Sequence, residues 1–266
     1  MSGKPYTILD KICEKKREEL KAAKEKMPFA EIFELARNAP DGPSFKAALK
    51  KNGDTPAVIA ELKKASPSAG VIRENFDHKT LAVQLEAAGA SALSVLTERN
   101  FFLGTPGYLT DAVSLVKIPV IRKDFIFNQY QICEAKIWGA SAILLIAAML
   151  TPEEFAWLYN IAKGLRLDVL AEAHDAEEID MLLACGADIV GVNCRNLKTF
   201  DTDSALAEKL LARIPDGIVK VSESAMRSRE DLVRAGRAGA DAALIGTALM
   251  SKENPALELE KLLGRA

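Results

Sequence analysis

The sequence predicts an α/β protein of the (β/α)8 or TIM barrel class, and three observations lead to this prediction. Short apolar segments alternate with helical segments from residue 56 onward. A Gly-Ala pair recurs four times along the same region. The chain has 266 residues, close to the roughly 250 residues of a typical barrel of this class. Strands that alternate with helices indicate a parallel sheet.

The N-terminal residues up to about 55 predict a helical extension that packs on the barrel. Residues 7–37 are rich in Lys, Glu, Leu and Ala, with apolar residues at helical spacing. Pro28, Pro40, Gly42 and Pro43 interrupt this region. We therefore expect one domain over residues 1–266, with the extension at 1–55 and the barrel at 56–266.

Eight apolar segments are candidate strands, and several of them are continuously apolar. This is typical of parallel strands that are buried on both faces. The candidates are residues 57–62, 92–96, 120–122, 142–147, 168–171, 189–192, 218–221 and 242–245.

An internal repeat supports the count of eight strands. Gly89, Gly139, Gly186 and Gly239 are each followed by alanine and then by an apolar segment. Glycine at the end of a helix favours the left-handed conformation of a C-terminal cap. A period near 50 residues corresponds to two βα units, so four copies close a barrel. The alternative, a doubly wound open sheet, lacks the expected GxGxxG motif.

The composition excludes several classes of function. Lys and Arg total 35, Asp and Glu total 37, and the net charge is −2, which does not favour nucleic-acid binding. No two of the cysteines form a CxxC pair, so neither a metal site nor a disulfide framework is predicted. The N-terminus has no secretory signal, and the longest apolar run, 142–150, is too short to cross a membrane. We expect a cytoplasmic protein with reduced thiols. The four cysteines are Cys13, Cys133, Cys185 and Cys194.

Charged and amide side chains follow most of the predicted strands, where active sites of such barrels form. Glu61 and Lys63 are two residues apart on one strand and therefore share a face. For any single one of these strand-end residues, a structural ion pair that fills the end of the barrel explains its presence equally well. Polar groups after six of the eight strands favour an active site. The others are Thr97, Glu98, Arg99, Lys123, Asp124, Glu172, His174, Asn193, Arg195 and Glu223.

The last two strand ends indicate a phosphate site. Ser224 and Ala225 follow the seventh strand, and Gly246 and Thr247 follow the eighth. Small residues leave backbone N–H groups accessible, and a helix that begins at Thr247 would favour an anion. The loops after strands seven and eight commonly hold phosphate in this fold. The sequence therefore predicts a small phosphorylated substrate.

These segments together resemble the indole-3-glycerol-phosphate synthase family over nearly the whole chain. The matching segments are AELKKASPS at 60–68, LTE at 96–98, RKDF at 122–125, AEAH at 171–174, GVNCRNL at 191–197, VSES at 221–224 and IGTALM at 245–250. The resemblance implies conversion of 1-(2-carboxyphenylamino)-1-deoxyribulose 5-phosphate to indole-3-glycerol phosphate, carbon dioxide and water, in tryptophan biosynthesis. It also implies a lyase that uses no cofactor and no metal.

The resemblance further implies roles for single residues. Lys123 is similar to the general acid of ring closure, Lys63 to the residue that holds the substrate carboxylate, and Glu172 to the general base. Glu61 and Glu223 resemble supporting carboxylates, and Asn193 an orienting amide. Ser66, Ser224, Gly246, Thr247 and Arg195 match phosphate-contacting positions. Phe125, Phe101, Leu144 and Leu145 are candidates for an apolar slot for the aromatic ring.

Two residues depart from the family pattern, and three alternatives stay open. Ala225 stands where the family usually has glycine and resists a positive φ, and we expect Cys194 to pack rather than react. We interpret His174 as a strand-end residue without a chemical role. The alternatives are a Schiff-base aldolase, a barrel isomerase that uses a Cys–Asp pair, and a binding barrel without activity. Contacts with other tryptophan-pathway enzymes are a further possibility.

Overall fold

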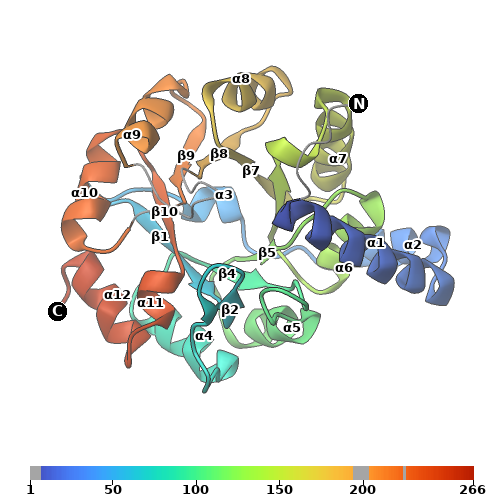
Figure 1. Ribbon diagram of the computed structural model, residues 1–266, viewed down its shortest axis with the longest axis horizontal. Coiled ribbons are helices and arrows are strands. Elements are labelled where there is room, and N and C mark those ends of the chain that lie inside the picture. The colour runs from blue at the N-terminus through green and yellow to red at the C-terminus, as the bar shows by residue number, and fades with distance from the viewer. Residues whose placement is uncertain (1–6, 194–203, 224–225) are drawn as a thin grey trace.

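A closed parallel barrel is the centre of the computed structural model, which describes residues 7–193, 204–223 and 226–266. Eight of its described strands close in the order β1-β10-β9-β8-β7-β6-β5-β4 (Figure 1). The predicted fold class is thereby confirmed. The barrel strands are β1 (Ala57–Leu62), β4 (Ala92–Leu96), β5 (Val120–Lys123), β6 (Ala142–Ile146), β7 (Asp168–Ala173), β8 (Ile189–Val192), β9 (Val219–Ser222) and β10 (Ala242–Ile245).

Four predicted strands differ from the observed ones at their ends, and one of them, β6, ends at Ile146, one residue before the prediction. β7 continues to Ala173 and so includes Glu172, which pairs in register with Ile146 and Gly191. The hydropathy pattern predicts an end at Ala171 because the carboxylate of Glu172 interrupts the apolar run. β5 and β9 likewise each extend one residue beyond the prediction, to Lys123 and Ser222.

Helices surround the barrel and follow the strands in alternation (Figure 1). Their starts are explained by local capping: Thr151 and Glu154 form a reciprocal capping box at α7, and Ser228 and Asp231 form one at α10. The ring contains α4 (His78–Ala87), α5 (Pro106–Leu115), α6 (Gln129–Ile137), α7 (Pro152–Gly164), α8 (Ala176–Ala184), α9 (Ser204–Arg213), α10 (Arg229–Arg237), α11 (Thr247–Met250) and α12 (Pro255–Leu263). Within the described residues, no helix combines the length and the apolar character that crossing a bilayer requires.

The four repeated glycines have the predicted conformation. Their φ angles are 104° at Gly89, 83° at Gly139, 83° at Gly186 and 103° at Gly239. Each lies directly after a helix and before a strand. The left-handed conformation costs a residue with a Cβ atom free energy, whereas glycine adopts it readily.

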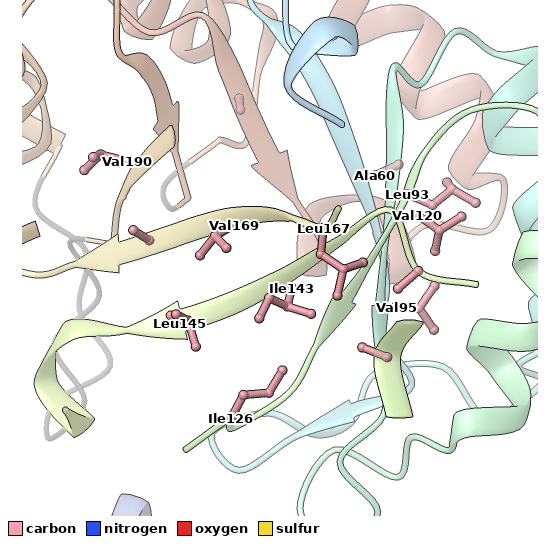
Figure 2. Packing of buried hydrophobic residues seen from close by; sticks show 14 of the residues in the cluster. Ala60, Leu93, Val95, Val120, Ile126, Ile143, Leu145, Leu167, Val169 and Val190 are labelled. Atoms are coloured by element: carbon pink, nitrogen blue, oxygen red, sulfur yellow. The ribbon is translucent and has the colours of Figure 1, made fainter. Parts of the chain in front are cut away.

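Alternation along the strands divides the core into two layers. On β6, Leu144 and Ile146 belong to the layer inside the barrel, and Ile143 and Leu145 belong to the layer between the sheet and the helices. Figure 2 shows part of the outer layer, with Ile143, Leu145 and Val169 on neighbouring strands. Leu145 therefore points away from the barrel interior, contrary to its suggested place in the aromatic slot.

The N-terminal extension forms α1 (Ile8–Lys26), α2 (Phe29–Asn38) and α3 (Phe45–Ala48). Pro28 separates α1 from α2, as the sequence indicates. α1 and α2 lie against α6 (Figure 1), where the Tyr130 hydroxyl donates to the carbonyl oxygens of Ala23 and Met27, both at 3.0 Å. Phe45 of α3 is buried in the inner core layer. The extension is thus tied to the barrel.

Candidate active site

A cavity of about 580 Å³ opens at the carboxyl ends of the barrel strands. Its lining comes from segments that are far apart in the sequence but meet at one end of the barrel. It includes most of the predicted site residues: Glu61, Lys63, Ser66, Lys123, Phe125, Leu144, Glu172, Asn193, Glu223, Gly246 and Thr247. Arg195, Ser224, Ala225 and also Cys194 lie outside the described residues.

Lys123, the last residue of β5, is at the centre of the charged groups. Its Nζ lies 3.4 Å from Oε2 of Glu172 on β7 and 3.4 Å from Oε2 of Glu223, which follows β9. Burial acts to lower the pKa of Lys123, but the two carboxylates outweigh it and hold this pKa well above its ordinary value. The lysine is therefore a charged ammonium group.

The two carboxylates beside Lys123 differ in environment. Burial acts to raise the pKa of Glu172, but Lys123 and His174 outweigh it and bring this pKa below its usual range. Burial and the nearby charge of Glu172 raise the pKa of Glu223 to about 8. Glu223 Oε1 is buried and has no hydrogen-bond partner among the described residues. These environments favour negative charge on Glu172 and a proton on Glu223.

Glu61 and Lys63 form a second charged pair on β1 and the segment after it. Glu61 Oε2 lies 2.5 Å from Lys63 Nζ, and both side chains are largely buried. Burial acts to raise the pKa of Glu61, but Lys63 and Lys123 outweigh it and lower this pKa. Gly246 lies against this pair, and a Cβ atom there would overlap Glu61 Oε2. Glycine at 246 thus makes room for the ion pair.

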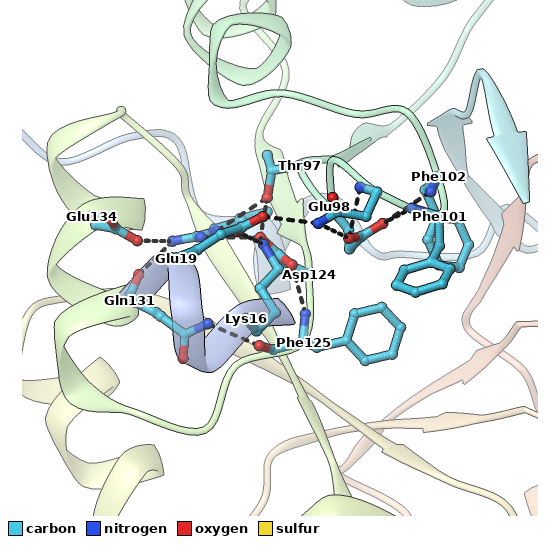
Figure 3. Close-up of polar contacts among 12 residues, drawn as sticks. Lys16, Glu19, Thr97, Glu98, Phe101, Phe102, Asp124, Phe125, Gln131 and Glu134 are labelled. Atoms are coloured by element: carbon cyan, nitrogen blue, oxygen red, sulfur yellow. Dashed lines mark hydrogen bonds and ion pairs between the residues drawn. The ribbon is translucent and has the colours of Figure 1, made fainter. Parts of the chain in front are cut away.

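The apolar wall of the cavity differs from the prediction at two residues, Phe101 and Leu145. Phe102 lines the cavity and Phe101 does not. The Phe102 ring packs near the Phe125 ring, with 6.0 Å between centroids. The backbone N–H groups of Phe101 and Phe102 both donate to Glu98 Oε2 (Figure 3), at 2.7 and 2.9 Å. The turn around this buried carboxylate selects which phenylalanine faces the cavity, and the sequence does not reveal it.

Candidate phosphate-contacting groups follow β1 and β10, whereas the two phenylalanines of the apolar wall follow β4 and β5. Ser66, Gly246 and Thr247 line it, and Thr247 begins the short helix α11, as predicted. Arg227 and Lys252 also line the cavity, although the sequence pattern does not single them out. Both follow helical or loop segments without a distinctive motif.

The N-terminal helix contributes to the site in a way that the sequence does not predict. Ile8, Leu9 and Ile12 of α1 line the cavity. Lys16 of α1 reaches Asp124, the residue after Lys123, with 2.9 Å between Nζ and Oδ2 (Figure 3). Thr97 and Arg122 donate to the same oxygen at 2.6 and 3.0 Å.

His174 also lies in the cavity wall. Its Nε2 is 3.4 Å from Oε1 of Glu172. His174, which we interpret from the sequence as a strand-end residue without a chemical role, thus lies beside the charged groups of the cavity. The contacts of the His174 ring depend on how β7 packs against α8, which the sequence does not predict.

Comparison with known proteins identifies the family. The family model for indole-3-glycerol phosphate synthase matches residues 9–262. The chain belongs to the indole-3-glycerol phosphate synthase family. An indole-3-glycerol phosphate synthase from Chlorobium phaeovibrioides is 46% identical over 241 residues, which are 91% of this chain and 93% of the relative. One from Campylobacter jejuni is 44% identical over 260 residues, 96% of this chain and 100% of the relative.

Solved structures outside the indole-3-glycerol phosphate synthase family share the fold. A 3-hexulose-6-phosphate synthase superposes with a TM-score of 0.62 at 13% identity, over 79% of this chain and 99% of that one. At such low identity the likeness shows the barrel fold alone.

Proposed function

We propose that this chain is an indole-3-glycerol phosphate synthase that uses Lys123, held between Glu172 and Glu223, to close the indole ring. The substrate is 1-(2-carboxyphenylamino)-1-deoxyribulose 5-phosphate, and the products are indole-3-glycerol phosphate, carbon dioxide and water. The family match over residues 9–262 supports the reaction. The observation that carries the assignment is the position of Lys123 Nζ, 3.4 Å from both carboxylates at the cavity centre.

In the first step, the ring carbon that bears the carboxylate attacks the ketone of the ribulose chain. Negative charge develops on the ketone oxygen, which becomes a hydroxyl when it takes a proton. The Lys123 ammonium stabilises that charge and donates the proton. An alkoxide is a strong base, so an ammonium group with a raised pKa is still acidic enough to protonate it.

The second step releases carbon dioxide and restores the aromaticity of the ring. We assign Lys63 to the substrate carboxylate, because its ammonium group lines the cavity and is held by Glu61 at 2.5 Å. A fixed cation orients the carboxylate for ring closure, and its neighbour Glu61 compensates the charge after carbon dioxide leaves.

The last step removes water and needs both a base and an acid. Glu172 suits the base because its pKa is lowered and it is ionised at neutral pH. Lys63 suits the acid that delivers a proton to the departing hydroxyl, and Asn193 lines the cavity as an orienting amide. Two groups with different proton affinities can divide these tasks.

We assign the two ends of the substrate to different groups of cavity-lining residues. We assign Phe102, Phe125 and Leu144 to the aromatic ring, since these apolar side chains line the cavity. For the phosphate we propose Ser66, Gly246 and Thr247, together with Ser224, Ala225 and Arg195. Arg227 and Lys252, which also line the cavity, add positive charge for the phosphate.

A Schiff-base mechanism is disfavoured by the charge on Lys123. An imine forms from a neutral amine, whereas the carboxylates around Lys123 keep it protonated. Borohydride should therefore not trap substrate on the protein.

Turnover of the synthetic substrate tests the proposal. Formation of indole-3-glycerol phosphate is followed by indole fluorescence. Carbon dioxide release in equal amount is expected. A folded sample without turnover would overturn the proposed function.

We also propose that the enzyme works in the cytoplasm without nucleic acid or membrane as a partner. The described cysteines, Cys13, Cys133 and Cys185, are free thiols, which agrees with a reducing compartment. Association with other enzymes of tryptophan biosynthesis is a further part of this proposal.

A further inference from the structure

His174 connects the end of β7 to the start of α8 and lies between two carboxylates. Its Nδ1 is 3.2 Å from Oε2 of Glu178, and its buried Nε2 is 3.4 Å from Oε1 of Glu172, an ion-pair distance without a hydrogen bond. The backbone N–H of His174 also donates to Glu178 Oε2, at 2.8 Å. Glu178 therefore holds this residue by both the backbone and the ring.

The position of the His174 ring gives Glu172 and Glu223 different electrostatic environments. Oε2 of Glu172 faces the Lys123 ammonium, and its Oε1 faces the His174 ring. Glu223 has the Lys123 ammonium at Oε2 and lies within hydrogen-bonding reach of Glu172, and its Oε1 has no hydrogen-bond partner among the described residues. Negative charge is thus favoured on Glu172, and the shared proton is favoured on Glu223.

The ring is itself held in the charged form. Burial acts to lower the pKa of His174, but Glu172 and Glu178 outweigh it and raise this pKa to about 10. Within the described chain, Glu172 on β7 and Glu178 on α8 are the charged groups that face the ring. Two charged groups from other parts of the barrel, Lys123 and Glu223, act on the pKa of Glu172. The charge of Glu172 in turn acts on the pKa of Glu61.

We propose that His174 is a positioning residue, a permanent imidazolium that orients Glu172 and directs the proton of the Glu172–Glu223 pair to Glu223. The inference rests on the proposed function, because it assigns Glu172 as the base of the dehydration step. Its physical basis is a cation at ion-pair distance in a partly buried site, which strengthens the interaction relative to water.

Titration of the ring tests the charge state without reference to activity. The chain has two histidines, His78 and His174, so two imidazole signals are expected by NMR, and the H174Q variant assigns them. The His174 signal should titrate near 10. A His174 signal that titrates at or below the ordinary value of about 6.5 would overturn the proposal.

The pH profile of kcat tests the effect on Glu172. Without the imidazolium, the pKa of Glu172 rises. Glu172 then becomes protonated, and stops acting as a base, at a higher pH than in the unaltered enzyme. In H174Q, the acid limb of kcat should move up by about one pH unit. The kcat near neutral pH should fall about tenfold, because Glu172 stays ionised there but is no longer held in position for proton transfer. The KM should stay within about twofold, because the ring acts on Glu172 and not on the substrate.

Two further variants separate charge from packing. H174K restores a cation and should return the acid limb toward that of the unaltered enzyme. E178Q removes the partner of Nδ1 and should lower the titration midpoint of His174 while leaving the fold intact by circular dichroism. An unchanged acid limb in folded H174Q, or a rise in KM alone, would overturn the positioning role. Absence of turnover in the unaltered enzyme would instead refute the proposed function, and the NMR titration would still report on His174.

Discussion

Lys16 and Asp124 form an ion pair of 2.9 Å that joins the N-terminal helix to the strand end beside the central lysine. Both side chains are almost fully buried. Asp124 is next to Lys123 in sequence and also accepts a hydrogen bond from the backbone N–H of Phe125 at 2.9 Å. The Asp124 carboxylate therefore connects the N-terminal extension to the strand end beside Lys123, in addition to the apolar residues of α1 that line the cavity.

Replacement of Lys16 by methionine should destabilise the protein. The change removes one partner of the buried Asp124 carboxylate. Burial acts to raise the pKa of Asp124, but Arg122 and Lys16 outweigh it and lower this pKa to about 2. Removal of one partner of a buried pair costs about 3–5 kcal/mol, and the remaining bonds from Thr97 and Arg122 reduce this to about 2 kcal/mol. Urea unfolding measures the loss. K15M, at an exposed pair with Glu18, should leave the midpoint unchanged; an equal effect of both variants would contradict the account.

The aromatic slot predicts different effects for two adjacent phenylalanines. F102A removes a ring that lines the cavity and packs near Phe125. It should raise the KM about tenfold, because a ring contact contributes on the order of 1 kcal/mol beyond the apolar area. F101A should have a KM close to that of the unaltered enzyme. Steady-state kinetics of the two variants would refute the assignment if F101A were the more impaired.

Gly246 should not tolerate a methyl group beside Glu61 and Lys63. A Cβ atom at this position would overlap Glu61 Oε2 and lie 2.9 Å from Lys63 Nζ. G246A should lower kcat/KM by about tenfold to a hundredfold through displacement of this pair. G164A, where a Cβ atom would meet nothing within 4 Å, is the control and should leave kcat/KM unchanged. Equal activity of the two variants would show that the ion pair need not be fixed.

The raised pKa of Glu223 predicts a basic limb in the activity profile. Because this pKa is about 8, Glu223 is protonated below that pH and ionised above it. Ionisation adds a second negative charge beside Lys123 and makes the ammonium a weaker proton donor, so kcat should fall as the pH rises through about 8. E223Q cannot ionise and should move this limb to higher pH. A basic limb that is unchanged in E223Q would assign it to another group.

Local patterns in the sequence predict the barrel and most of the residues at the strand ends that line its cavity. Continuous apolar runs and the repeated glycines depend on short-range physics, and the charged residue at each strand end can be read beside them. Glu61 and Lys63 were paired because strand geometry fixes residues two apart on one face.

The remaining features depend on contacts between distant segments. Lys16 and Asp124 are 108 residues apart, and no pattern connects them. The choice of Phe102 over Phe101 depends on the turn around Glu98, and the role of His174 depends on Glu178 in α8. Sequence alone gives no register between such segments, so it does not predict these partners.

Turnover by the K123M variant is the measurement that tests the central claim most directly. Methionine keeps the length of the side chain and removes the ammonium group between Glu172 and Glu223. Substrate binding, measured by calorimetry, should persist within about tenfold, while kcat should fall by at least about a hundredfold to ten-thousandfold. Near-normal kcat in a folded K123M protein would contradict the assignment of Lys123 as the acid of ring closure.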